Sequence, residues 1–394
     1  MSKIEAVPSS DVDFYADAFI SDPLPQYKIL RDLGPVVWLK AQQAFVLTRF
    51  DQVVEALRQD DVFISGNGLS LNDDVNALLV GNSLNTDGDE HRRKRSITAT
   101  PINLKGIVEL TPYIEAAAEQ LAEKLAERVS FDAVLDFAQI LPLSIVTELV
   151  GLPESAQRKM LTWASAAFNL FEGYNQRSKD AFDDLRGLQK FLADEGRPER
   201  LKEGGLAQRI FDEAPAKGFS KAEAAQLMRD YINPSLDTTI SVLGFVAYYF
   251  AKEPAQWDIL RDDPSLIPNA IEEVVRLSTP IRAFSRYCAQ DYQIERAVIP
   301  KGSRVIIVYA SANRDERMFE KPDVFDVTRN VRKHVGFGHG VHMCMGLHLA
   351  RLEMCSVLAS MLKRVTRWEL DGEPKLVLNN TIRAFERLPM RIVC

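Results

Sequence analysis

The residues best suited to chemistry lie in one short glycine-rich segment, GFGHGVHMCMG at positions 336–346. Four glycines within eleven residues are expected where the backbone turns tightly or approaches another group closely. A helical pattern follows from Leu347 to Leu358, so Cys344 precedes a helix N-terminus, where the dipole and free N–H groups stabilise a thiolate. The segment alone leaves three interpretations open: a thiolate ligand of haem iron, a structural thiol, or a zinc site with His339, His342 and His348.

Three further pairs of polar residues lie upstream at close spacing: Glu273 with Arg276, His91 with Arg95, and Asp237 with Thr238. Helical residues three or four apart share one face, so the first pair can form a salt bridge and the second can donate to one carboxylate. A carboxyl group beside a hydroxyl can relay protons. Each pair alone is also compatible with ordinary surface or helix structure.

Helical periodicity dominates the chain and supplies the elements that would position these residues. We expect helices over residues 113–129, 131–151, 220–252, 268–277 and 347–358. Ser220 is a suitable N-cap with Glu223 three residues later, and Gly151 followed by Pro153 is a stop signal. Pro234 lies inside the long helix and removes a backbone hydrogen bond there, so we expect a kink.

Strand patterns are fewer and shorter. Residues 36–39 and 44–47 predict one hairpin, and residues 298–299 and 304–308 predict another across Pro300-Lys-Gly302. The stretch from Arg329 to His342 is rich in glycine, histidine and basic residues and fits no regular element. The sequence therefore predicts a mainly α fold with small β-sheets.

The overall composition narrows the class of protein. A net charge of -7 argues against a nucleic-acid binder, which is more often basic. The N-terminal segment has no basic region followed by an apolar one, and the apolar stretch Val242–Ala251 is too short to span a bilayer. The four cysteines show no disulfide spacing. We expect a cytosolic protein without membrane contact.

The segment around Cys344 resembles the FxxGxxxCxG haem-binding signature of the cytochrome P-450 family, with matches at Phe337, Gly340, Cys344 and Gly346. The resemblance implies haem b as the cofactor and Cys344 as the iron ligand. It also implies a set of cofactor contacts, which here are His91, Arg95, Arg286, Phe337, Gly338, His342 and Gly346.

The other pairs occur in the order that this family shows. Glu273 and Arg276 resemble its ExxR motif, in which the pair joins an arginine before the cysteine loop, here Arg329. Asp237 and Thr238 match the acid–alcohol pair of the long I-helix on the oxygen-activating side. A ligand sensor would not need that pair, so the resemblance implies an enzyme.

The residues before the acid–alcohol pair depart from the family pattern. Pro234-Ser235 replaces the usual glycine, which implies a differently opened helix and an altered water structure. A peroxide-using branch of the family carries Arg-Pro in place of the pair. Because Asp237 and Thr238 remain, dioxygen with external electrons is favoured over peroxide.

The resemblance covers nearly the whole chain. It implies one domain over residues 1–394, with the haem between the I-helix and the Cys344 loop with the helix that follows. No fused reductase or ferredoxin is expected, so electrons would come from a separate ferredoxin and its NAD(P)H-dependent reductase. Arg92, Arg93 and Lys94 could form a positive patch for an acidic electron donor.

The substrate is inferred from the residues at the family's pocket positions: Asn67, Leu84, Phe168, Phe171, Asn233, Leu236, Ile281, Phe284, Ser285 and Ile382. They suggest a compact apolar pocket in which Asn67, Asn233 or Ser285 orients one polar group. Several segments are similar to the members that oxidise small benzoates, but the arginine of their first pocket loop is absent. We therefore expect hydroxylation or O-demethylation of a neutral phenol or aryl ether, with a terpenoid or other small hydrophobe as the alternative.

Overall fold

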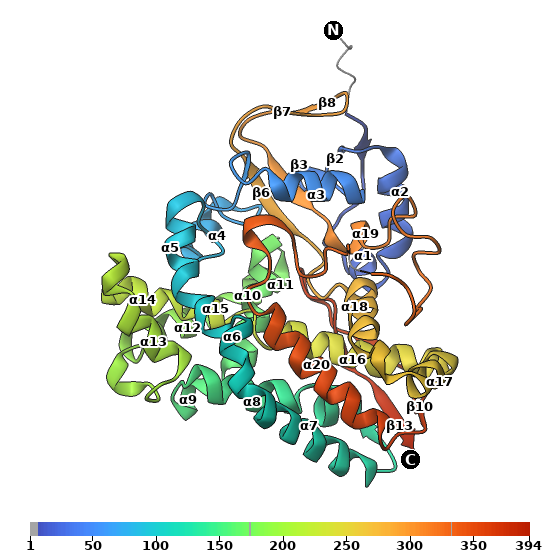
Figure 1. Cartoon of the computed structure of the whole chain (residues 1–394). Coiled ribbons are helices and arrows are strands. Elements are labelled where there is room, and N and C mark those ends of the chain that lie inside the picture. Colours follow the sequence, from blue (N-terminus) through green and yellow to red (C-terminus); the bar gives the residue numbers. More distant parts are fainter. Residues whose placement is uncertain (1–6, 173–174, 332) are drawn as a thin grey trace.

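The computed structural model describes residues 7–172, 175–331 and 333–394. Helices form most of the molecule, and a β-sheet lies at one end of it (Figure 1). Those that shape the interior are α5 (Gly88–Thr98), α7 (Thr111–Ala126), α8 (Ile140–Val150), α10 (Met160–Glu172), α16 (Asp237–Lys252), α18 (Ile267–Ser278) and α20 (Leu347–Leu362). The mainly α architecture with small sheets is confirmed.

The helix expected over residues 220–252 is broken into three pieces, α14 (Lys221–Leu227), α15 (Arg229–Ile232) and α16. Its beginning is as predicted, because Ser220 and Glu223 form a complete capping box. The kink expected at Pro234 is instead a full interruption over residues 233–236. Proline cannot donate to the carbonyl one turn earlier, and its ring crowds that turn, so the helix restarts only at Asp237.

Six of the described strands join one sheet, in the order β1 (Ser9–Ser10), β2 (Val37–Leu39), β3 (Ala44–Leu47), β9 (Arg304–Ile307), β6 (Phe284–Cys288) and β4 (Phe63–Ile64). The first predicted hairpin is confirmed, since β2 and β3 pair antiparallel. The remaining strands form three smaller groups, β5 (Phe131–Asp132) with β10 (Arg367–Leu370) and β13 (Pro389–Val393), β7 (Tyr292–Ile294) with β8 (Ala297–Ile299), and β11 (Lys375–Leu376) with β12 (Phe385–Arg387).

The second predicted hairpin is wrong in its pairing. Strand β8 pairs with β7 across a two-residue turn, while β9 lies between β3 and β6 in the large sheet. Gly302 does turn the chain, with a φ of 87°, but that turn leads from one sheet into another. Strand β9 has three consecutive buried residues, so both of its faces are covered, as is typical of a strand inside a larger sheet and not of an isolated hairpin.

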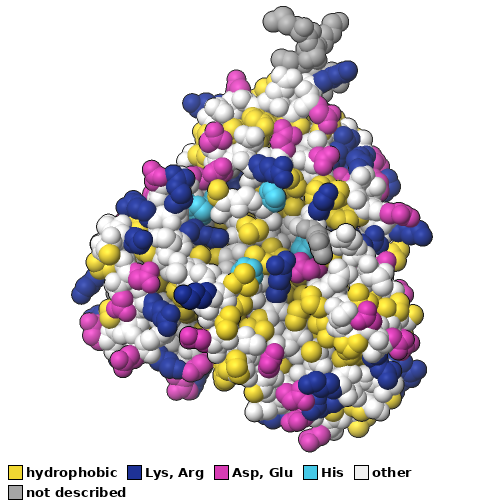
Figure 2. Space-filling model, viewed as in Figure 1, with side chains coloured by type: hydrophobic (Ala, Val, Ile, Leu, Met, Phe, Trp, Pro, Cys, Tyr) yellow, Lys and Arg dark blue, Asp and Glu magenta, His cyan; other side chains and the backbone are white. Residues whose placement is uncertain are grey.

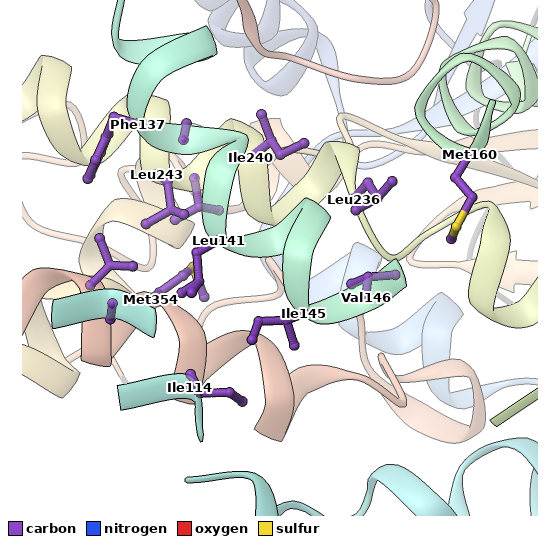
Figure 3. Packing of buried hydrophobic residues seen from close by; sticks show 14 of the residues in the cluster. Ile114, Phe137, Leu141, Ile145, Val146, Met160, Leu236, Ile240, Leu243 and Met354 are labelled. Carbon is purple, nitrogen blue, oxygen red and sulfur yellow. The ribbon is translucent and has the colours of Figure 1, made fainter. Parts of the chain in front are cut away.

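The main core fills the space between α8, α16, α20 and the neighbouring helices (Figure 3). Ile145, Leu243 and Met354 come from three of these helices and are fully covered. One helical stretch, Ala133–Val150, is long and apolar enough to cross a membrane, but half of it is buried in this core. Its apolar character is therefore explained by packing. Its first turn is a π-helix (Ala133–Ala138), preceded by the short strand β5 rather than by a helix from residue 131.

Candidate functional site

A cavity lies between the cysteine loop and the beginning of α16. Its wall on the loop side contains Phe337, Gly338, His342, Cys344 and Gly346. The opposite wall contains Asn233, Pro234, Ser235 and Thr238. The structure thus places the glycine-rich segment around Cys344 across the cavity from the helix break at residues 233–236.

The cysteine loop is held by its own backbone. Cys344 donates its N–H to the carbonyl of Phe337 at 2.8 Å. Gly338 has a φ of 74°, and a Cβ on Gly340 would lie 2.2 Å from the carbonyl oxygen of Leu57. Both positions therefore require glycine, one for its conformation and one for close approach.

The thiol of Cys344 faces the cavity, and the burial of its surroundings raises its pKa above the ordinary value. A hydrogen bond from the backbone of Gly346 and the charges of Arg95 and Arg351 act in the opposite direction. The stabilisation of the thiolate that we expected from the helix N-terminus is therefore opposed by this burial. A bound cation would deprotonate a coordinating thiol directly.

The zinc alternative is not supported by the geometry. Within residues 7–172, 175–331 and 333–394, no group of three or more His, Cys, Asp or Glu side chains is arranged to hold a metal ion. His339 instead accepts a hydrogen bond from Arg58 at 3.0 Å. One cysteine with no clustered co-ligands suits an iron that a macrocycle already coordinates.

Cationic and imidazole groups gather at one side of the cavity. Arg95, Arg286 and His342 line it, and the buried ring of His91 lies behind, 4.2 Å from the ring of His342. Burial and the nearby positive groups lower the pKa of His91 to about 3, so this ring is neutral. The Nε2 atoms of both histidines are buried without a hydrogen-bond partner among the described residues. The orphaned Nε2 of His91, together with His342 and two arginines, fits the propionate carboxylates of haem b.

Asp87 completes this side of the site, and sequence analysis missed it. It accepts backbone N–H bonds from Ser65 and Gly66, at 2.9 and 2.5 Å, and lies 3.6 Å from Nε2 of His342. These bonds and the imidazole hold its pKa below the usual range, although burial alone would raise it. Asp87 therefore ties the loop after β4 to His342.

The three-residue cluster predicted from the ExxR motif is assembled. Arg276 donates to both carboxylate oxygens of Glu273 at 2.7 and 2.8 Å, and Arg329 donates to the same carboxylate at 3.0 Å. Glu273 and Arg276 are completely buried. Arg276 also donates to the carbonyls of Asn313 and Pro322, so the cluster ties α18 to the chain before the cysteine loop.

The basic run after His91 does not form the predicted positive patch. Lys94 is buried and pairs with Glu90 at 2.7 Å, while Arg92 pairs with Asp89. Arg93 lies over the ring of Phe219 at 5.0 Å. The charges of Arg92 and Lys94 are thus compensated within α5 itself, because the residues one turn earlier are acidic, whereas Arg93 contacts residues outside the helix.

The helix break shapes the wall opposite Cys344. Thr238 donates its hydroxyl proton to the carbonyl of Pro234 at 3.0 Å, and Ser235 donates to the carbonyl of Tyr231. These hydroxyl groups satisfy carbonyls that the interrupted helix leaves free. The Thr238 oxygen consequently retains only acceptor capacity toward the cavity.

Asp237 does not belong to the described cavity wall. Its carboxyl group is partly buried beside Thr238 and has no hydrogen-bond or ion-pair partner in the part of the chain that the structure describes. Burial raises its pKa to about 7. Such a group exchanges protons readily near neutral pH.

Six of the predicted pocket residues line the cavity, namely Leu84, Phe168, Phe171, Asn233, Ile281 and Phe284. Four other described residues that we expected in the wall do not line the cavity. Ser285 donates its hydroxyl to the carbonyl of Leu69, and Arg304 donates to the backbone carbonyl of Asn67, which lies outside the cavity wall. Leu236 is buried in the core, and Ile382 forms a β-bridge with Ile281. Only Asn233 thus remains of the three polar side chains proposed to orient a substrate.

Three charged residues of the cavity wall were missed from the sequence, Arg229, Asp230 and Glu353. Arg229 donates to the carbonyls of Leu79 and Val80, and the adjacent Asp230 accepts from the Ser83 N–H at 3.0 Å. Burial raises the pKa of Asp230 and that of Glu353, the latter to about 8. Arg229 itself was the signal available in the sequence. It lies in a segment that we expected to be helical, and arginine is rarely buried unless it is paired.

Comparisons with known proteins agree with this geometry. Residues 261–385 match the family model described as Cytochrome P450. The chain is 33% identical over 393 residues to Cytochrome p450 CYP199A2 of Rhodopseudomonas palustris, covering 98% of this chain and 95% of the relative. It is 27% identical over 403 residues to 6-deoxyerythronolide B hydroxylase of Saccharopolyspora erythraea, covering 96% and 98% of the two chains.

Solved structures share the fold. The chain superposes with a TM-score of 0.86 on the Mycobacterium marinum cytochrome P450 CYP268A2 in complex with pseudoionone, at 24% identity over 98% of this chain and 99% of that one. CYP108D1 from Novosphingobium aromaticivorans gives a TM-score of 0.84 at 25% identity, with 96% of each chain covered.

Proposed function

Because this chain belongs to the cytochrome P450 family and is a haem b monooxygenase, we propose that it oxidises a small, neutral aromatic molecule, by hydroxylation or by O-demethylation of an aryl ether. The observation that supports this proposal is a cavity that has Cys344 in one wall and an apolar, partly aromatic surface above it.

The cavity provides a distinct group of residues for each part of the cofactor. We assign Cys344 as the iron ligand, with Phe337 and Gly346 beside it in the wall. The arginines Arg95 and Arg286 would neutralise the propionates, and the imidazole of His342, whose pKa is lowered by burial, would contribute a hydrogen bond. Bound haem supplies the iron that activates dioxygen for insertion of one oxygen atom into a C–H bond.

Proton delivery is assigned to Thr238 and Asp237. The Thr238 oxygen, whose proton is engaged by Pro234, accepts a hydrogen bond from water or from a protonated group in the cavity. The carboxyl of Asp237, with a pKa of about 7, then resupplies protons from behind that hydroxyl. This division of roles lets a proton enter without opening the apolar wall to solvent.

The charge of the cavity wall favours a neutral substrate. Arg229 is adjacent to Asp230, so the cation and the anion compensate each other instead of presenting a net positive charge to a carboxylate. Asn233 is 3% exposed, and neither its amide oxygen nor its nitrogen has a partner among the described residues. An amide both donates and accepts, which suits a phenolic hydroxyl or an ether oxygen.

We assign electron delivery to a ferredoxin and its NAD(P)H-dependent reductase, acting on the face that carries the cysteine loop. Val341 and Met343 are 44% and 43% exposed in this loop, and Leu104 and Val108 are 62% and 66% exposed nearby in α6 (Leu104–Ile107) and the turn after it. On the face over α5 and α20, lysine and arginine side chains lie among apolar and acidic ones (Figure 2). Exposed apolar side chains on the face that carries the iron ligand suit the docking surface of a separate electron carrier. Four free thiols support a reducing, cytoplasmic location.

Spectra of the haem-loaded protein test the proposal. The reduced, CO-bound form should show the strongly red-shifted band of thiolate-ligated haem, and a histidine-type band would refute the assignment of Cys344. A panel of phenols, aryl ethers, benzoates and terpenes should then be titrated for low-to-high-spin conversion. Phenols or aryl ethers should convert the spin state most completely, whereas a preference for benzoates or terpenes would overturn the substrate assignment. Turnover with ferredoxin and reductase, but not with peroxide, is expected.

A further inference from the structure

We propose that Glu272, His334 and Arg351 form a positioning cluster that fixes the cysteine loop from the side opposite the substrate and thereby tunes the iron. The inference rests on the proposed ligation by Cys344. None of the three residues belongs to the signature motifs, and each comes from a different segment. Glu272 lies in α18, His334 lies just before the cysteine loop, and Arg351 lies in α20. The cluster is separate from the one formed by Glu273, although the two glutamates are neighbours in sequence.

The hydrogen bonds of the cluster are short and converge on one carboxylate. Arg351 donates to the carboxylate of Glu272 through Nε at 2.6 Å and through Nη2 at 2.9 Å. His334 places Nε2 at 2.7 Å from Oε2 of the same carboxylate. A two-pronged arginine and an imidazole on one carboxylate restrict all three side chains to one geometry.

The bonds also define the tautomer of His334. Gly336 directs its backbone N–H at Nδ1 of His334 at 3.0 Å. Because a backbone N–H can only donate, Nδ1 must accept, and the ring proton resides on Nε2, where it is donated to Glu272. His334 thus bridges a carboxylate on α18 and the backbone of the cysteine loop. Its side chain is 4% exposed, so water does not compete for these bonds.

From Gly336 and Phe337 the constraint reaches the sulfur ligand. The guanidinium of Arg351 lies 5.2 Å from the centre of the Phe337 ring, and the His334 ring lies 5.9 Å from it. Phe337 in turn accepts the N–H of Cys344 at 2.8 Å. The loop already packs closely against α18 here, because a Cβ added at Gly336 would lie only 2.6 Å from Cγ1 of Val275. Groups that orient a metal ligand in this way tune both its basicity and the metal's potential.

The test compares two substitutions of one residue in the haem-loaded enzyme. His334→Leu removes both hydrogen bonds of the ring. His334→Asn keeps an acceptor oxygen where Nδ1 stood and can still receive the Gly336 N–H. Glu119→Gln is the matched control, since Glu119 is also paired with two basic residues, Lys363 and Arg364, near the end of α20.

The readouts are the midpoint reduction potential and the CO spectrum, which do not depend on any substrate. We expect His334→Leu to weaken thiolate donation and raise the ratio of reduced to oxidised protein at fixed potential by about tenfold, which is 59 mV for one electron. Part of its reduced CO complex should also lose the thiolate-type band. His334→Asn should stay within about twofold of the wild type, and Glu119→Gln should not change.

Each outcome is decisive. Equal potentials for His334→Leu and wild type would overturn the proposal, as would equal shifts in His334→Leu and His334→Asn. A wild-type spectrum without the thiolate band would instead refute the proposed function, so the two failures are distinguishable. Far-UV circular dichroism of each variant establishes that the compared proteins are folded.

Discussion

Replacing Asp237 by asparagine should make the protein more stable and less active at the same time. The carboxyl group is partly buried at the restart of a helix and has no partner among the described residues, so its charge is unfavourable where it stands. Asparagine has nearly the same shape and carries no charge. The substitution therefore removes an electrostatic cost and, with it, the proposed source of protons.

The magnitude follows from the pKa. Burial raises the pKa of Asp237 from 3.8 to about 7, and each unit corresponds to about 1.4 kcal/mol. Between these two pH values the unfolded chain releases the proton that the native protein still holds. The stability of the wild type consequently falls as the pH rises, by roughly 4 kcal/mol in all, and stays lower above pH 7. Asp237→Asn lacks this loss, so its advantage should grow by roughly 3 kcal/mol between pH 5 and pH 7.5.

The assay is urea unfolding of the haem-loaded protein, followed by circular dichroism at pH 5, 6 and 7.5. All other titrating groups are common to both proteins, so the difference in free energy of unfolding isolates Asp237. Asp262→Asn, at the exposed end of α17 (Pro254–Asp262), is the control for the same chemical change at a solvent-exposed position. Product formation by Asp237→Asn should be about 100-fold slower, as for loss of a general acid. A stability difference that is constant with pH would refute the raised pKa and the role in proton delivery built on it.

Three other substitutions test the remaining assignments. Cys344→Ser should abolish the thiolate-type band of the reduced CO complex while leaving the far-UV circular dichroism unchanged; a band that persists would exclude Cys344 as the ligand. Glu273→Gln should lower the free energy of unfolding by about 3–5 kcal/mol in urea titrations, because it leaves Arg276 buried without its counter-charge. An effect below about 1 kcal/mol, as for a surface pair, would contradict that reasoning. Thr238→Ala should continue to consume electrons and dioxygen but yield less product per electron pair, and unchanged coupling would show that its hydroxyl has no part in proton delivery.

The sequence alone was sufficient wherever the determining interaction is local. The Cys344 segment, the capping box at Ser220 and the stop at Gly151 depend on residues a few positions apart, so spacing and residue type specify them. The same holds for the contact between Glu273 and Arg276, which lie one helical turn apart. Resemblance to a known family added Arg329, which no local pattern would have paired with Glu273.

Tertiary structure decided everything that depends on burial or on distant neighbours. Pro234 predicts a disturbed helix in any context, but only packing determines that the helix stops at Ile232 and restarts at Asp237. The basic run after His91 predicts an exposed positive patch, yet Lys94 is buried and pairs with Glu90. Strand β9 was assigned to its sequence neighbour because pairing energies are similar for many partners, and the enclosing sheet selects among them. The two sides of the cavity differ in the same way. Its iron-binding side is encoded in consecutive residues, whereas its substrate side is assembled from separate helices and loops and exists only in the folded chain.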